Sequence, residues 1–162
     1  MILAIDGFGA SGKSVLAARL AEQFAGRVVA LDDFTRPGTP TWEHARFVDE
    51  VLTPLRAGRG AAYRPWRYDQ ATPSPTVHLP PGGLLIVEGV SALALAAVEL
   101  AGVWWDLSVW VDADDALRQA RIAERDGEAL LPLWCEQWWP SERRYFAEES
   151  PLERVDFVLR AR

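Results

Sequence analysis

Short apolar runs alternate with longer amphipathic segments along this chain. Runs that are apolar at successive positions and end in a polar residue are typical of strands buried on both faces of a parallel sheet, whereas the intervening segments have helical periodicity. The expected strands are Ile2–Asp6, Val28–Leu31, Leu84–Glu88, Leu107–Val111 and Val155–Leu159, and the expected helices are Lys13–Phe24, Trp42–Leu55, Ser91–Leu100, Ala113–Arg125 and Trp134–Glu148. The alternation predicts an α/β fold with a mainly parallel sheet.

Composition narrows the class of protein. With 162 residues, no internal repeat and no clear boundary, residues 1–162 are expected to form a single domain, as a monomer or a homodimer. A net charge of −6 argues against a nucleic-acid partner, because phosphate backbones attract basic surfaces. The longest apolar stretch, residues 84–100, is interrupted by Glu88 and Glu99, so we expect no membrane span. A single cysteine, Cys135, and no evident signal peptide indicate a cytoplasmic protein.

The strongest motif is the segment GFGASGKS at residues 7–14, which matches the phosphate-binding P-loop, G-x-x-x-x-G-K-[ST]. It follows a predicted strand, precedes a predicted helix and contains Lys13, the only lysine of the chain. Loop amides and the helix N-terminus would surround phosphate oxygens, Lys13 would reach the β- and γ-phosphates, and the Ser14 hydroxyl would bind Mg²⁺. The predicted nucleotide-binding residues of the loop are Gly7, Gly9, Ala10, Ser11, Gly12, Lys13, Ser14 and Val15.

Acidic residues follow three of the predicted strands, at Asp6, at Asp32-Asp33 and at Glu88. The carboxyl ends of parallel strands meet at one edge of a sheet, so these side chains should lie near the phosphates. Asp32 would accept the proton of an acceptor hydroxyl or order Mg²⁺, unless it only stabilises a turn. Glu88 would hold a water of the Mg²⁺ shell, unless it serves only as a carboxylate at a helix N-terminus.

A stripe of arginines lies on the helix expected at 113–125. Arg118, Arg121 and Arg125 are spaced i, i+3 and i+7, which places three guanidinium groups on one helical face. Such a face suits the charge that develops on a transferring phosphoryl group, although a solvated charged face is the common alternative. Beside a P-loop we interpret Arg121 and Arg125 as catalytic residues of a lid and Arg118 as a nucleotide contact.

An aromatic and basic segment, YRPWRYD at residues 63–69, lies within the Pro- and Gly-rich stretch 56–83. A loop of this length in a compact domain is usually functional, and these side chains could grip an acceptor by stacking and hydrogen bonds. Packing of a proline-rich loop against the surface is the alternative. The tryptophans at 134, 138 and 139 have the spacing of a core stripe, and His44 and His78 are interpreted as structural or surface residues.

Taken in order, GFGASGKS, LDDFTR, YRPWRYD, LLIVEG, LRQARIAERDG and ERVDFVL resemble the uridine kinase-like branch of P-loop kinases. The resemblance spans nearly the whole chain and implies a nucleoside-kinase-like three-layer α/β/α fold with a five-stranded parallel sheet and a small lid. It also implies that Asp32 is the catalytic base. The implied acceptor-binding residues are Tyr68 and Asp69. We predict that Asp33 and Phe34, beside Asp32, also contact the acceptor. Thr35 and Gln70 depart from the pattern of uridine kinases, as does the lack of an evident base-enclosing hairpin.

These observations predict an ATP- and Mg²⁺-dependent kinase that phosphorylates a hydroxyl of a small metabolite, with nucleosides among the candidates. A non-nucleoside acceptor, such as a vitamin precursor or an antibiotic hydroxyl, is the main alternative. A nucleotide-dependent regulatory NTPase and a relative that only binds nucleotide are the others. The chain has no asparagine and therefore lacks the guanine-recognition motif of common GTPases.

Overall fold

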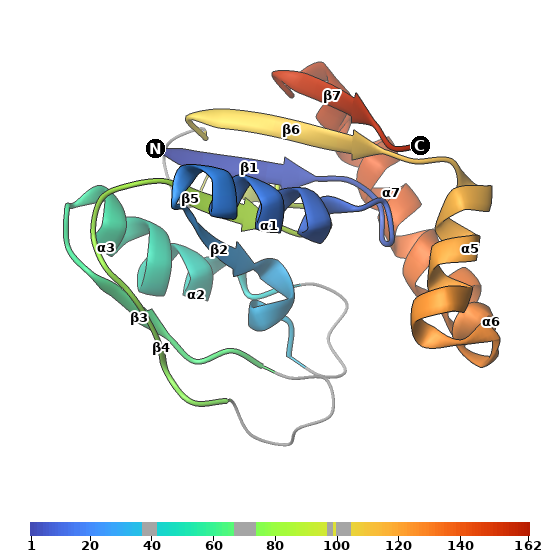
Figure 1. The fold of residues 1–162 in the computed structure, drawn as a ribbon, viewed down its shortest axis with the longest axis horizontal. Helices are drawn as coiled ribbons and strands as arrows, with labels where there is room; N and C mark the ends of the chain where they lie inside the picture. The colour runs from blue at the N-terminus through green and yellow to red at the C-terminus, as the bar shows by residue number, and fades with distance from the viewer. Residues whose placement is uncertain (37–41, 67–73, 97–98, 100–104) are drawn as a thin grey trace.

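The computed structural model describes residues 1–36, 42–66, 74–96, 99 and 105–162. Five parallel strands form its central sheet, in the order β2-β5-β1-β6-β7, which confirms the predicted sheet (Figure 1). The strands are β1 (Ile2–Asp6), β2 (Arg27–Ala30), β5 (Leu85–Glu88), β6 (Leu107–Asp112) and β7 (Phe157–Arg160). Because β1 lies between β5 and β6, its carboxyl end is the topological switch point at which open α/β sheets bind ligands.

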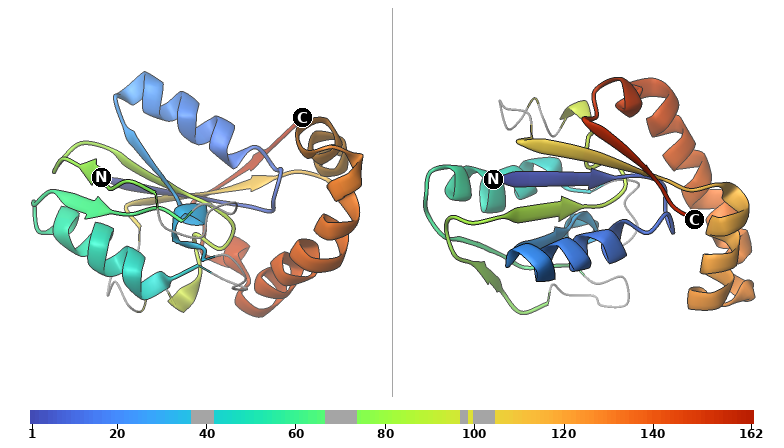
Figure 2. Two further views of the ribbon diagram at one scale, coloured as in Figure 1. Left: turned by 90° about the horizontal axis from the view of Figure 1, so that it is seen from below. Right: turned by 45° about the horizontal axis from the view of Figure 1, so that its top comes forward.

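Both faces of the sheet are apolar at its centre, since side chains alternate along β1 and β5 and both sets are buried there. On β1, Ile2 and Ala4 belong to one core cluster and Leu3 and Ile5 to the other. Helix α1 (Lys13–Phe24) covers one face, and a continuous helical segment covers the opposite face (Figure 2). That segment consists of α2 (His44–Phe47), a π-helical turn η2 (Val48–Leu52) and α3 (Thr53–Arg56). The result is the predicted three-layer architecture.

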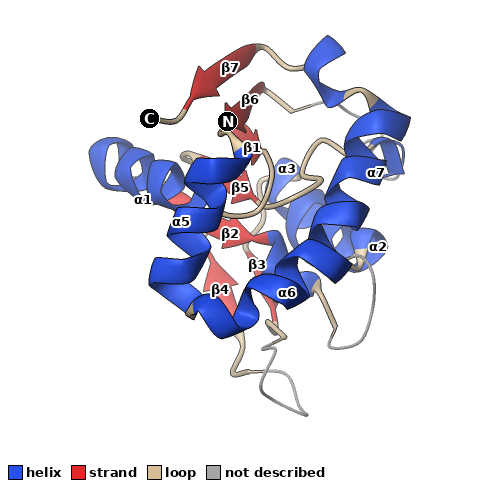
Figure 3. Cartoon of the chain, turned by 90° about the vertical axis from the view of Figure 1, so that its right-hand side faces the viewer, coloured by secondary structure: helices blue, strands red, loops and turns tan. Residues whose placement is uncertain are grey.

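Helices α5 and α6, which follow β6, lie beyond the carboxyl ends of the strands, and α5 carries the arginines predicted for the lid (Figures 1 and 3). Helix α5 begins after Asp114, whose carboxylate accepts a hydrogen bond from the amide of Leu117, and ends before Gly127. Helix α7 returns alongside the sheet, where Phe146 packs on Trp110 with ring centroids 5.3 Å apart. The elements are α5 (Asp115–Asp126), η3 (Glu128–Leu130), α6 (Leu131–Leu133), η4 (Trp134–Trp138), α7 (Trp139–Glu149) and η5 (Pro151–Glu153).

The structure differs from the sequence-based prediction in three places. The strand expected at 28–31 gives way at its end to a 3₁₀ turn, η1 (Leu31–Phe34). A two-stranded antiparallel ribbon, β3 (Ala61–Tyr63) and β4 (Val77–Leu79), lies within the stretch predicted as a loop. Residues 91–93 form a turn instead of the start of a helix. In the parts of the chain that the structure describes, no helix is long and apolar enough to cross a membrane.

His44 provides a test of this packing. Burial lowers its pKa below the ordinary value of 6.5, against a smaller opposing effect of the Glu149 charge. The His44 imidazole therefore binds a proton more readily in the unfolded chain than in the native state. The free energy of unfolding should then fall as the pH drops below 6.5. We expect denaturation between about pH 7.5 and pH 5 to show a smaller pH dependence for His44→Gln than for the wild type. His78→Gln, at an exposed position, should behave as wild type. Identical pH profiles for all three proteins would contradict the lowered pKa of the half-buried His44.

Candidate phosphoryl-transfer site

The P-loop connects β1 to α1 at the switch point of the sheet. Gly7 has φ of 143°, and a Cβ there would lie 2.4 Å from the carbonyl oxygen of Val111 on β6, so only glycine fits. Gly12 precedes the helix with φ of 108°, and Ala10 is also left-handed, with φ of 60°. Alternation of left- and right-handed residues is the backbone geometry that turns successive amides toward one anion.

Lys13 lies within this loop and is only 7% exposed. Its ammonium group donates a hydrogen bond of 2.9 Å to the carbonyl oxygen of Phe8. Burial lowers the pKa of Lys13, and the charges of Asp6, Glu88, Glu142 and Asp32 act in the opposite direction. Lys13 is therefore a buried cation whose charge is favoured by four surrounding carboxylates.

Ser14, the first residue after Lys13, contacts Glu88, one of the acidic residues predicted at the strand ends. Its Oγ donates a hydrogen bond of 3.0 Å to Oε1 of Glu88, at the end of β5. Burial raises the pKa of Glu88, and the nearby Lys13 charge partly offsets this. A hydroxyl and a carboxylate oxygen this close form a hard-oxygen donor pair of the kind that binds Mg²⁺ together with water and phosphate. The residues present therefore fit the expected ion.

The LDDF segment folds into η1, and the side chains of Asp32, Asp33 and Phe34 lie in three different environments. Asp32 is exposed, and its charge acts on the pKa values of both Lys13 and Arg125. Asp33 is 9% exposed and accepts a hydrogen bond of 2.9 Å from the hydroxyl of Tyr63. Phe34 is fully buried and stacks on Tyr63, so it belongs to the core and not, as predicted, to an acceptor surface.

The arginine stripe of α5 is divided among three different environments. Arg118 is 1% exposed and is hydrogen bonded to the Gly9 carbonyl, so it supports the loop from behind instead of lining the nucleotide site as predicted. Arg121 donates from Nη1 to the carbonyl oxygens of Ala10 and Ser11, at 3.2 and 2.8 Å. Arg125 is 59% exposed and forms two hydrogen bonds with Asp126, which are the main cause of its raised pKa.

Glu142, on α7, is a P-loop contact that sequence reasoning missed. Its Oε1 accepts the amide of Gly9 at 2.8 Å, and its Oε2 lies 2.5 Å from Nη2 of Arg118. The side chain is buried, and burial raises its pKa against the opposing charge of Arg118. The pair joins the loop to two helices of the lid region. No local pattern marks Glu142, because 133 residues separate it from Gly9.

Asp6 is a second residue whose contacts were not foreseen. It is completely buried and accepts hydrogen bonds from the amides of Gly7, Ser91 and Leu93 and from the hydroxyl of Tyr145, at 2.6–3.0 Å. Burial raises its pKa despite these donors. Asp6 therefore ties the start of the P-loop to the segment after β5 and to α7, which makes it a structural hub of the site.

The remaining predicted residues are Val15, Tyr68 and Asp69. The side chain of Val15 is 57% exposed, on the first turn of α1. Tyr68 and Asp69 lie outside the described residues.

Gly9 gives a steric test of the loop. A Cβ at this position would lie 2.5 Å from the Trp134 ring and 2.6 Å from Oε1 of Glu142. We expect Gly9→Ala to cost about 1–3 kcal/mol of stability, as overpacking does, and to weaken ATP binding. Gly26→Ala is the matched control, because there the nearest atoms belong to the flexible Leu84 side chain, at 3.2 Å. Calorimetric titration with ATP and thermal denaturation measure both effects; a Gly9→Ala protein equal to Gly26→Ala would contradict this packing.

The sequence matches no known family model and no curated protein. Solved structures do match it. A candidate fructose transport system kinase from Silicibacter sp. TM1040 has 16% identity and a TM-score of 0.72, over 98% of this chain and 89% of that one. Shikimate kinase from Bacteroides thetaiotaomicron has 14% identity and a TM-score of 0.54, over 99% and 86%. Deoxyadenosine kinase from M. mycoides, solved with bound dATP, has 12% identity and a TM-score of 0.50, over 99% and 90%. The chain therefore has the α/β fold that these P-loop kinases share.

Proposed function

We propose that the protein is an ATP- and Mg²⁺-dependent phosphotransferase that moves the γ-phosphate of ATP to a hydroxyl group of a small metabolite. One observation carries the proposal. A buried P-loop lysine, Lys13, and an exposed carboxylate, Asp32, follow two parallel strands, β1 and β2, at the same edge of the sheet. A site that only binds nucleotide does not require a carboxylate placed to accept a proton, whereas phosphoryl transfer to a hydroxyl does.

The donor half of the site is the P-loop. Its amides and the N-terminus of α1 would bind the phosphates, and Lys13 would exchange the Phe8 carbonyl for β- and γ-phosphate oxygens. A compact ammonium suits this position, because it approaches as a point charge where a planar guanidinium would clash. Ser14 would bind Mg²⁺ directly, and Glu88 would hold a water of its shell. When bound, Mg²⁺ neutralises charge on the phosphates and orients them.

The acceptor half begins at Asp32. The carboxylate is exposed, as a base that must reach an incoming hydroxyl has to be, whereas the neighbouring Asp33 is engaged by Tyr63. We assign Asp32 as the general base and Asp33 as the residue that fixes η1. Asp32 could also help to order Mg²⁺, as the sequence analysis suggested.

The lid arginines divide the remaining work. Arg121 donates hydrogen bonds to the carbonyls of Ala10 and Ser11, which fixes the two peptide groups that follow these residues in the loop. Arg125 is exposed on the last turn of α5, and its guanidinium would stabilise the transferring phosphoryl group. This assignment requires Arg125 to leave Asp126 when nucleotide binds.

The names of the structural neighbours support a small-molecule acceptor, since they include kinases of sugars, deoxynucleosides and shikimate. The narrower assignment, a uridine kinase-like enzyme, rests on the order of the LDDF, YRPWRYD and arginine segments in the sequence. The alternative of a regulatory NTPase is less well supported, because the structural neighbours named above are kinases.

A screen of ATP consumption tests this proposal. Purified protein, ATP and Mg²⁺ would be combined with single nucleosides, sugars and other small hydroxylated compounds, with Lys13→Ala as the control. We expect at least one acceptor to stimulate ATP consumption in the wild type and none to do so in Lys13→Ala. Only background hydrolysis with every compound would favour the regulatory NTPase.

A further inference from the structure

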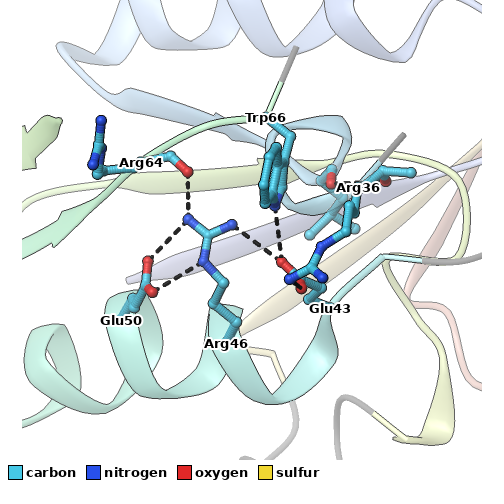
Figure 4. Close-up of polar contacts among 8 residues, drawn as sticks. Arg36, Glu43, Arg46, Glu50, Arg64 and Trp66 are labelled. Atoms are coloured by element: carbon cyan, nitrogen blue, oxygen red, sulfur yellow. Dashed lines mark hydrogen bonds and ion pairs between the residues drawn. The ribbon is translucent and has the colours of Figure 1, made fainter. Parts of the chain in front are cut away.

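A cavity lies beside η1, between the helical segment α2–η2 and strand β3. Its volume is about 410 Å³, within the range of small-molecule sites. Aromatic walls and charged groups line it together, and Figure 4 shows how they face one another. The residues that matter here are Arg36, Glu43, Arg46, Glu50, Tyr63 and Trp66.

Arg46 fixes one wall of this cavity. It donates hydrogen bonds to Glu43 at 3.2 Å and to Glu50 at 3.0 and 3.2 Å, and it also contacts the carbonyl oxygen of Arg64 (Figure 4). Hydrogen bonds from Arg46 and Trp66 lower the pKa of Glu43 despite some burial, so this carboxylate stays ionised. These contacts of Arg46 join the α2–η2 segment to the residue after β3, and they hold the carboxylate oxygens of Glu43 and Glu50 in fixed positions.

Trp66 and Arg36 form the opposite wall. The indole Nε1 of Trp66 donates to Oε2 of Glu43 at 3.1 Å, which sets the orientation of the ring. The guanidinium of Arg36 lies 5.1 Å from the Trp66 ring centroid and pairs with Glu43 at 3.0 Å. Arg36 thus lies over one face of the indole, and the ring is surrounded by fixed donors and acceptors.

The cavity is connected to the transfer site through η1. The Tyr63 hydroxyl donates to the Asp33 carboxylate, and the Trp66 amide donates to the Asp33 carbonyl oxygen at 2.7 Å. Asp32, the proposed base, is the preceding residue. A molecule bound against Trp66 would therefore lie beside η1, the turn that carries the proposed base Asp32.

We propose that this cavity binds the acceptor, at the part remote from the reacting hydroxyl, and that the acceptor is a neutral polyhydroxylated compound, a sugar or polyol. The inference rests on the proposed function and names its substrate class. Hydroxyl groups both donate and accept, so they match a wall on which guanidinium and carboxylate groups alternate. The C–H face of a sugar would pack on Trp66, since an indole offers a broad apolar surface.

Charge argues against ionised acceptors. Two of the three arginines that line the cavity, Arg36 and Arg46, already pair with its two glutamates, so an anion would have to displace Glu43 from Arg36 and would meet the carboxylates. A cationic acceptor would meet the arginines in the same way. Because these charged groups already pair with one another, the cavity would recognise an acceptor through short-range hydrogen bonds.

The test compares D-fructose and ribitol with fructose 6-phosphate, shikimate and uridine as acceptors. Phosphoryl transfer is measured as ADP formation. Binding is measured separately by saturation-transfer NMR, which does not depend on catalysis. We expect the neutral sugars or polyols to be preferred. Trp66→Leu and Arg36→Met should raise the acceptor KM by about tenfold with little change in kcat. Arg59→Met, at an exposed position outside the cavity, is the matched control and should behave as wild type.

Each other outcome contradicts a different statement. Preferred transfer to fructose 6-phosphate, shikimate or uridine would overturn the acceptor class and leave the kinase function standing. Transfer to a sugar with a KM unaffected by Trp66→Leu and Arg36→Met would overturn the location. Sugar binding that Trp66→Leu abolishes, without any ADP formation, would support the cavity and contradict the phosphotransferase. Absence of sugar binding by the wild type would overturn the inference itself.

Discussion

Asp32→Asn should lower kcat for phosphoryl transfer by about 10²–10⁴-fold while the Kd for ATP changes by less than about twofold. The reason is geometric. The Asp32 carboxylate is exposed and is not part of the P-loop, so its removal takes away the base but none of the groups that hold the phosphates. Steady-state kinetics with a productive acceptor and calorimetric titration with ATP measure the two quantities separately.

Asp33→Asn is the matched control for this experiment. Asp33 is buried and accepts the Tyr63 hydroxyl, so its replacement should lower thermal stability before it affects chemistry. A parallel loss of kcat and ATP affinity in Asp32→Asn would assign Asp32 to the nucleotide or the metal. Normal turnover in that variant would remove it from the mechanism.

Arg118→Met should be among the most destabilising single changes in the protein. Arg118 and Glu142 are 1% and 4% exposed, and their closest atoms are 2.5 Å apart. Removing one partner of a buried ion pair leaves an uncompensated charge and costs about 3–5 kcal/mol. At roughly 2–4 °C per kcal/mol for a domain of this size, the Tm should fall by about 6–20 °C. Scanning calorimetry measures this directly.

Arg143→Met is the matched control for Arg118→Met. Arg143 also pairs with Asp115, and its guanidinium also lies over the Trp139 ring, but its side chain is 58% exposed. Exposed pairs of this kind contribute about 0–1 kcal/mol, so the Tm should change little. The double variant Arg118→Met/Glu142→Gln should recover part of the lost stability, because it removes both charges and keeps an oxygen that can accept the Gly9 amide. Equal effects of Arg118→Met and Arg143→Met would contradict the buried pair.

The donor half of the site could be predicted from the sequence because its determinants are local. The P-loop is a contiguous motif between a strand and a helix, and Glu88 follows an apolar run that could only be a central strand. Parallel strands then bring their carboxyl ends together without further information. The Ser14–Glu88 hydrogen bond is the direct consequence of that register.

Contacts that depend on tertiary packing could not be predicted in the same way. Helical spacing places Arg118 and Arg125 on one face, but which of them turns inward depends on α7, and the sequence does not say where α7 packs. Phe34 is adjacent to two functional candidates, yet the turn η1 directs it into the core. Strands β3 and β4 have three residues each, too few to display a period-two pattern.

The central claim is that the γ-phosphate leaves ATP for an acceptor hydroxyl. The most direct measurement follows the fate of that phosphate, with ATP labelled at the γ-position, Mg²⁺ and the acceptor that stimulates ATP consumption most. The account predicts that the label appears in the phosphorylated acceptor with the wild type, and not with Asp32→Asn or Lys13→Ala. Label recovered only as inorganic phosphate, with every acceptor offered, would contradict it.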